Sequence, residues 1–244
     1  MLVLPPQTRP ADAPLERAHA PSGTAYGLFR RCLRWDFGFS CAFCLVHEAD
    51  LIAHGVEGTG LTSVEHYALQ STSPEQAGTY ANCFYACRFC NGSRSTRAAE
   101  NGDAHLLDPC AATWASHFQL TNFELRPGDG DASAAYTHSV YDMDDPRKVQ
   151  MRRDRFEAIE GALHLVSQVP ALEAELLKLA TGLGPSDAKT LVDAAQELRR
   201  QLRCAFDDLA RYAPVPRDAD RPCSCSILEH ALPQFLSDQC RTAP

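Results

Sequence analysis

The chain reads CAFC at residues 41–44, VEHY at residues 64–67 and CRFCN at residues 87–91, and these stretches decide its fold. Each CxxC pair places two thiols on one tight turn, and two such turns facing each other supply the four ligands of a tetrahedral zinc site. His47 and Cys83 are alternative ligands nearby. We predict a structural zinc ion held by Cys41, Cys44, Cys87 and Cys90.

Three further side chains lie between and beside the pairs: Glu65, His66 and Asn91. Hydrolysis of a phosphodiester needs an activated water and a cation that neutralises the phosphoryl oxygens. A histidine can act as general base near neutral pH, and Mg²⁺ prefers a few oxygen ligands from the protein. We therefore expect His66 to activate water, and Glu65 and Asn91 to bind a catalytic Mg²⁺ or Mn²⁺. Asn91 is also well suited to cap a helix that begins after the second pair.

The order of these residues resembles the zinc-containing form of the HNH endonuclease family. The resemblance rests on the two CxxC pairs, on Glu65-His66, on Asn82 five residues before the second pair, and on Asn91 directly after it. It covers roughly residues 26–109, where LLDP at 106–109 looks like the family's usual exit from the motif. Two departures are mild, since Glu65 stands where Asp is more frequent and Arg94 where Lys is common.

The resemblance implies a specific fold and a role for each residue. The family folds this region as two short strands and a helix, the ββα-metal motif. His66 would be the general base, and Glu65 and Asn91 would bind the catalytic ion. Asn82 would brace, through hydrogen bonds to backbone, the loop that presents His66. HNH modules with extensions often occur as nuclease effectors of bacterial antiviral defence systems or in mobile elements.

Basic residues gather around the second cysteine pair, where phosphate contacts would lie. We predict that Arg88, Arg94 and Arg97 contact nucleic acid, in the first instance DNA, while the sequence leaves the choice between DNA and RNA open. Further candidates for the same patch are Arg30, Arg31 and Arg34. The formal net charge of -8 argues against a protein that coats nucleic acid through bulk charge.

Composition indicates a globular protein of the cytoplasm. Hydrophobic residues make up 45% of the 244-residue chain, enough for a packed core beside the metal site. The 11 cysteines are an odd number and include zinc-type spacing, which favours free thiols over a secreted disulfide framework. Neither a signal peptide nor a run of about 20 apolar residues is visible, so we expect no membrane association.

We predict an α+β protein: a treble-clef-like ββα-metal HNH core with short strands, followed by a helical C-terminal half. The expected parts are a flexible lead-in (1–24), the nuclease domain (25–145), a helical extension (146–213) and a Pro- and Cys-containing tail (214–244). Within them we expect strands near 63–67, 118–120, 123–126 and 137–141, a helix from Asn91 to Glu100, and amphipathic helices after Pro146.

Two questions stay open at this level. The helical half could pack on the nuclease domain, form a homodimer or bind a regulatory protein. The tail carries a possible second metal site of irregular spacing, formed by Cys223, Cys225, His230 and Cys240. The alternative to an enzyme is a catalytically silent zinc-knuckle module that binds nucleic acid or protein.

Overall fold

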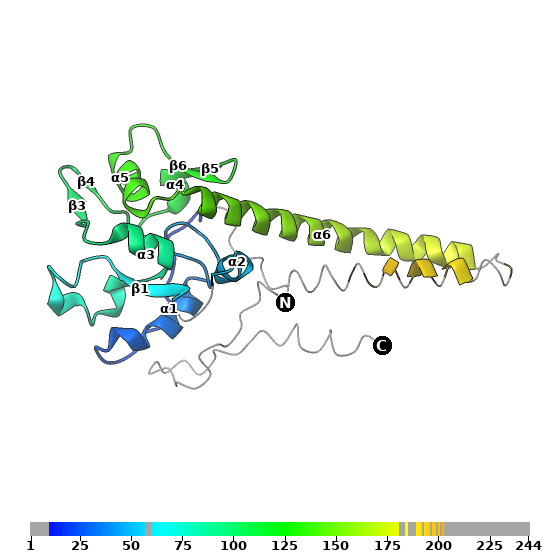
Figure 1. Ribbon diagram of the computed structural model, residues 1–244, viewed down its shortest axis with the longest axis horizontal. Helices are drawn as coiled ribbons and strands as arrows, with labels where there is room; N and C mark the ends of the chain where they lie inside the picture. The colour runs from blue at the N-terminus through cyan, green and yellow to red at the C-terminus, as the bar shows by residue number, and fades with distance from the viewer. Residues whose placement is uncertain are drawn as a thin grey trace. The chain divides into compact units, whose positions relative to one another are not determined.

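The computed structural model describes residues 10–56 and 60–180, with residues 184, 189–191, 193–195, 197, 198, 200 and 202 beyond them (Figure 1). Helices and small antiparallel sheets are mixed along the chain, which confirms the α+β class. By its internal contacts the chain divides into two compact units, with the boundary between Asp154 and Arg155. The tail at 214–244, with its candidate second metal site, lies outside the described residues.

The elements follow one another in this order: η1 (Tyr26–Leu28), α1 (Arg30–Asp36), α2 (Glu48–Ala53), β1 (Thr62–His66), η2 (Pro74–Gln76), η3 (Tyr80–Asn82), β2 (Cys83–Cys87), α3 (Arg88–Arg94), β3 (Glu100–Asn101), β4 (Ala104–His105), α4 (Trp114–His117), β5 (Phe118–Thr121), β6 (Glu124–Pro127), α5 (Ala132–Tyr141) and α6 (Pro146–Ala180). The elements labelled η are 3₁₀-helices.

Strands β1 and β2 form an antiparallel pair in which Glu65 lies opposite Phe84 and His66 opposite Cys83. All five residues of β2 are buried, because α1 and α3 both pack against this strand. Helix α3 follows β2 without a loop, since Cys87 has an extended backbone and its sulfur accepts a hydrogen bond from the amide of Cys90. The order strand, strand, helix is therefore present around the second cysteine pair.

Helix α3 is shorter than predicted and begins earlier. It starts at Arg88, three residues before Asn91, and ends at Arg94. Ser95 has a φ of 44°, a conformation that a non-glycine residue seldom adopts and that a helix cannot continue through. The sequence pattern missed this break because no glycine or proline marks it.

The first cysteine turn and the hairpin share one apolar core. Phe43, inside the first CxxC pair, stacks on Tyr141 with ring centroids 3.8 Å apart. The Phe43 ring also lies 5.7 Å from that of Phe84, which belongs to β2. Burial of these large rings contributes on the order of 2 kcal/mol each, so the metal site does not carry the fold alone.

The third strand predicted at 137–141 is a helix. Residues 132–141 form α5, and the Asp131 carboxylate caps it by accepting a hydrogen bond from the Ala134 amide at 2.8 Å. The aspartate and the alanine-rich first turn outweigh the strand preference of the β-branched and aromatic residues that follow. The two strands before it are confirmed as the β5–β6 hairpin, whose turn residues Asn122 and Phe123 have φ of 51° and 68°.

The sequence predicted a flexible lead-in over residues 1–24, of which residues 1–9 lie outside the described part of the chain. Residues 10–24 are described, and their backbone is bonded to the rest of the fold. Leu15 donates its amide to the Pro109 carbonyl, and Ala11 accepts from the Ala115 amide, each at 2.9 Å. The proline-rich composition predicts flexibility. The bonding partners of this segment lie about a hundred positions further along the chain, so composition does not reveal them.

The helical half begins with α6, a single helix of 35 residues from Pro146 to Ala180. Its first nine residues, from Pro146 to Asp154, belong to the same compact unit as the hairpin. Among the described residues, none of the helices combines the length and the apolar character that a membrane crossing needs.

Candidate functional site

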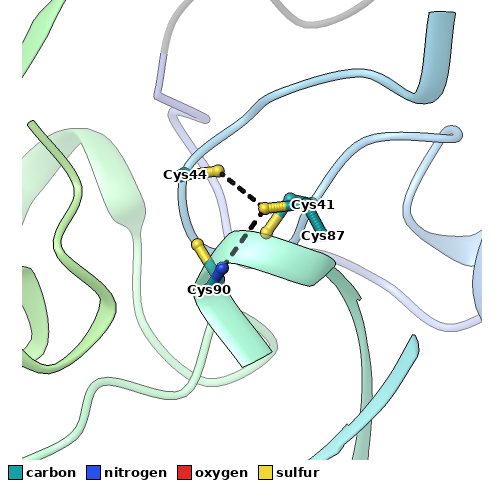
Figure 2. Close-up of side chains that lie close together, drawn as sticks. All are labelled: Cys41, Cys44, Cys87 and Cys90. Atoms are coloured by element: carbon teal, nitrogen blue, oxygen red, sulfur yellow. Dashed lines mark hydrogen bonds between the residues drawn. The ribbon is translucent and has the colours of Figure 1, made fainter. Parts of the chain in front are cut away.

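The four predicted cysteines come together in the structure. One ligand atom from each of Cys41, Cys44, Cys87 and Cys90 lies within 4.8 Å of all the others (Figure 2). The Sγ atoms of Cys44 and Cys87 are 3.7 Å apart. A tetrahedral Zn²⁺ with Zn–S bonds of ~2.3 Å requires sulfurs about 3.8 Å apart, so the arrangement fits a structural zinc ion.

The cluster is electrostatically suited to a cation. All four thiols are buried, and burial raises the pKa of Cys87 and Cys90 well above the usual value. Burial acts on Cys44 in the same direction, but hydrogen bonds from the neighbouring thiols hold its pKa well below the usual value. Four sulfurs this close can all ionise only when a cation shares their charge, and a divalent metal supplies it.

Two buried basic side chains beside the cluster were missed by sequence reasoning. Lys148 is 0% exposed, and its Nζ donates to the carbonyls of Tyr141 at 2.5 Å and Asp142 at 2.8 Å. Burial alone would lower the pKa of Lys148, but the nearby cysteine thiolates raise it instead. Arg152 donates to the Cys44 carbonyl at 3.1 Å and so fixes the first cysteine turn. Their i, i+4 spacing on α6 was visible in the sequence, but no motif links it to the cysteines.

The two alternative zinc ligands have other partners. His47 Nδ1 accepts a hydrogen bond from the Ala49 amide and caps α2. The Cys83 thiol points to the Thr79 carbonyl at 3.4 Å. Within the part of the chain that the structure describes, the four cysteines are the only group of three or more His, Cys, Asp or Glu residues placed to hold a metal.

His66 is the last residue of β1, and its ring is fixed from several sides. Nε2 lies 3.1 Å from the Ala77 carbonyl and 3.2 Å from the Gln70 side-chain amide. The Tyr26 ring meets the imidazole edge-on at a centroid distance of 4.9 Å. A hydrogen bond to the Ala77 carbonyl requires the proton on Nε2, so the Gln70 amide must turn its oxygen rather than its nitrogen toward Nε2. Nδ1 of the neutral ring is then left as an acceptor. Burial lowers the pKa of His66 and so favours this neutral form.

Glu65 is buried beside His66 and faces one cation. Its Oε1 lies 3.4 Å from Nε of Arg94. Burial raises the pKa of Glu65 to about 7, even though Arg94 acts to lower it. Arg94 therefore does not fully offset the cost of burying this carboxylate, and the group is only partly ionised at neutral pH.

Arg94 does not occupy the surface position predicted for it. The side chain is 0% exposed, and its guanidinium donates to the carbonyls of Ala98 and Tyr67, each at 2.8 Å. A guanidinium enclosed in this way cannot reach a phosphate outside the fold. The predicted nucleic-acid contact of Arg94 is therefore corrected to an internal brace between α3 and Glu65.

Asn91 lies on α3, one helical turn before Arg94, and is half-buried. Residues three apart share one side of a helix, and Arg94 reaches Glu65 from that side. Asn91 therefore lies on the side of α3 that faces β1. It is not the helix cap, because the cap of α3 is Cys87.

Asn82 makes the hydrogen bonds expected of a loop brace. Its Oδ1 accepts from the Ala68 amide at 2.8 Å, and its Nδ2 donates to the carbonyls of Ala68 at 3.1 Å and Gln76 at 3.2 Å. These bonds join both sides of the loop that follows His66.

The remaining basic residues divide into exposed and buried groups. Arg88 and Arg97 are exposed, and Arg97 also donates to the Ser139 carbonyl at 2.7 Å. Arg34 is only 2% exposed and forms a two-point ion pair with Glu48, so it does not extend the patch. Nucleic-acid contacts of Arg88 and Arg97 stay predictions.

Comparison of the chain with protein-family models, curated proteins and solved structures found no match.

Proposed function

We propose that this chain is a metal-dependent endonuclease of the HNH type, acting on nucleic acid and in the first instance on DNA. The observation that carries the proposal is the environment of the Glu65-His66 pair at the end of β1. Nε2 of His66 is held by the Ala77 carbonyl, and the buried carboxylate of Glu65 has only part of its charge compensated by Arg94. The strand, strand, helix order adds support, because Asn91 lies on α3 one helical turn before Arg94, which pairs with Glu65 on β1.

The proposed reaction is hydrolysis of a phosphodiester bond. Nδ1 of His66 accepts a proton from a water molecule, whose oxygen forms a new bond to phosphorus while the bond to the leaving oxygen breaks. The carboxylate of Glu65 and the amide oxygen of Asn91 would hold a Mg²⁺ or Mn²⁺ ion. When bound, that ion would supply charge stabilisation for the phosphoryl and leaving oxygens. Asn82 keeps the loop beside His66 in place, and the four-cysteine zinc site anchors α3.

The first test is cleavage of plasmid DNA and of single-stranded DNA and RNA by purified protein with Mg²⁺ or Mn²⁺. His66→Ala should abolish cleavage while the zinc content stays unchanged. His164→Ala is the matched control, because this histidine is exposed on α6 in the second compact unit. Equal cleavage by wild type and His66→Ala would reject the catalytic role of His66. If wild type cleaves none of these substrates, a silent zinc-knuckle module is the better description.

A role in bacterial defence or in a mobile element, with a protein partner bound by the helical half, belongs to the same proposal. It rests on the family resemblance alone. Co-purification of a partner with the full chain, and its loss when residues 155–213 are deleted, would support that part.

A further inference from the structure

The segment before α1 places one basic side chain, Arg17, against the backbone next to the proposed active site. Nη1 of Arg17 donates to the carbonyls of Tyr80 at 2.9 Å and Cys83 at 2.7 Å, and Nη2 donates to the carbonyl of Ala81 at 3.2 Å. These carbonyls belong to η3 and to the first residue of β2. One guanidinium thus collects three carbonyl groups at the end of a short 3₁₀-helix, and the Tyr80 carbonyl among them also accepts from the Cys83 amide.

Aromatic rings surround the same guanidinium. Its central carbon lies 4.7 Å from the ring centroid of Phe84, 5.2 Å from that of Tyr80 and 5.4 Å from that of Phe37. A planar cation can stack on rings and donate in its own plane at the same time, whereas an ammonium group has no planar face to stack. The site is therefore specific for arginine rather than for positive charge.

The segment around Arg17 is anchored on both sides. Before it, the Leu15 amide is bonded to the Pro109 carbonyl. After it, Oδ1 of Asp36 accepts from the amides of Ala18 at 3.0 Å and His19 at 3.2 Å. The other oxygen of Asp36 accepts from the Tyr80 hydroxyl at 2.6 Å. Tyr80 of η3 therefore contacts both Asp36, which anchors the segment, and Arg17.

From η3 the contacts lead to His66 in two short steps. Asn82, the last residue of η3, bonds through its side chain to both sides of the loop after His66, and its carbonyl accepts from the Tyr67 amide at 2.9 Å. Gln76, whose carbonyl accepts from Asn82, is followed directly by Ala77, and the Ala77 carbonyl accepts from Nε2 of His66. The strand residue opposite His66 is Cys83, whose carbonyl Arg17 binds directly.

We infer that Arg17 is a positioning residue for the His66 site: by binding the carbonyls of η3 and Cys83, it fixes the loop whose Ala77 carbonyl orients the imidazole. Arg17 does not touch the substrate in this scheme and acts through Asn82 and Ala77. The inference rests on the proposed nuclease function for its effect on rate, but its effect on the ring of His66 is independent of that function.

The test compares Arg17→Lys, which keeps the charge, and Arg17→Ala with a control, Arg126→Ala. Arg126 is an exposed arginine paired with Glu124 on β6. Misplacement of a catalytic group by ~1 Å costs about a hundredfold in rate, so Arg17→Lys should lower kcat by roughly ten- to a hundredfold. KM should change less than about twofold, because binding groups are untouched. Added guanidinium ion at millimolar concentration should restore part of the kcat of Arg17→Ala, and Arg126→Ala should match wild type.

A second readout does not need cleavage. In protein with ¹⁵N-labelled histidine, NMR at one fixed pH reports which nitrogen of His66 carries the proton. Wild type should show the Nε2-protonated form, and Arg17→Lys should show a mixture of tautomers with faster exchange of that proton. If wild type does not cleave but the His66 signals respond to Arg17→Lys, the nuclease proposal fails and the positioning role stands.

Other outcomes overturn the inference. Unchanged kcat and unchanged His66 signals in Arg17→Lys would show that Arg17 has no influence on the site. A fall in kcat that parallels loss of zinc or of melting temperature would assign Arg17 a merely structural role. Arg17→Lys decides the matter if Arg17→Ala does not fold.

Discussion

Replacing Glu65 by Gln tests whether this carboxylate is as buried and as poorly compensated as its surroundings indicate. The rise of the Glu65 pKa from 4.5 to about 7 corresponds to roughly 3 to 4 kcal/mol, at about 1.4 kcal/mol per pH unit. The side chain is only 5% exposed, so solvent screening reduces this value little. The folded state holds the Glu65 proton more tightly than the unfolded state does. The stability that this tighter proton binding contributes is therefore fully present below pH 4.5 and is lost as the pH rises to about 7.

The measurement is urea unfolding of zinc-loaded wild type and Glu65→Gln between pH 5.5 and 8, without added Mg²⁺. Glutamine does not titrate, and the cost of leaving Arg94 without its carboxylate is nearly the same at every pH. The unfolding free energy of wild type minus that of Glu65→Gln should therefore fall by about 2 kcal/mol between about pH 5.5 and pH 8. Effects of pH on the zinc site cancel in the difference.

Addition of Mg²⁺ extends the same test to function. An ion bound by the Glu65 carboxylate favours its ionised form, so ~10 mM Mg²⁺ should flatten the pH dependence of wild type and leave Glu65→Gln unchanged. A difference that does not vary with pH would show that Glu65 ionises as it does in water, and would refute the buried-carboxylate argument. A pH-dependent difference that Mg²⁺ does not alter would remove Glu65 from the metal ligands.

Three further predictions concern the cysteines and the basic residues. Cys87→Ser should lose the zinc ion, with metal content falling from about one equivalent to none, while Cys110→Ser should retain it; zinc retained in Cys87→Ser would refute the four-cysteine site. Lys148→Met removes a buried cation beside the thiolates, and should lower zinc affinity by about tenfold in a chelator competition; unchanged affinity would contradict an electrostatic role. Arg88→Ala and Arg97→Ala should each weaken DNA binding and lower its salt dependence by about one phosphate contact; a salt slope equal to that of wild type would remove that residue from the interface.

The parts of the site that the sequence predicted depend on short-range patterns. A CxxC pair fixes the distance between its two thiols locally, so only the meeting of two turns had to be inferred. The strand at 62–66 follows from its residue types and from the turn signals around it. The hydrogen bonds of Asn82 also stay within its own loop and its neighbour.

Burial of charged residues could not be predicted, because it depends on elements far apart in the sequence. Arg88, Arg94 and Arg97 look alike along the chain, yet two are exposed and Arg94 is fully enclosed. Arg94 is buried because carbonyls of Tyr67 and Ala98 and the carboxylate of Glu65 all converge on it. The role of Arg17 was hidden for the same reason, since its acceptors lie more than sixty residues further along.

The length of α3 explains why the zinc site and the proposed catalytic residues belong together. A helix of seven residues is unstable by itself, because so few hydrogen bonds cannot offset the cost of nucleation. Here both ends are fixed from outside: Cys87 and Cys90 join the first turn to the four-cysteine cluster, and Arg94 joins the last turn to β1. Asn91 lies between these two attachments, so its distance from Glu65 depends on both. In the proposed scheme, a zinc ion at the four cysteines would take no part in the chemistry but would fix the geometry of Glu65 and Asn91, the residues proposed to hold the catalytic ion.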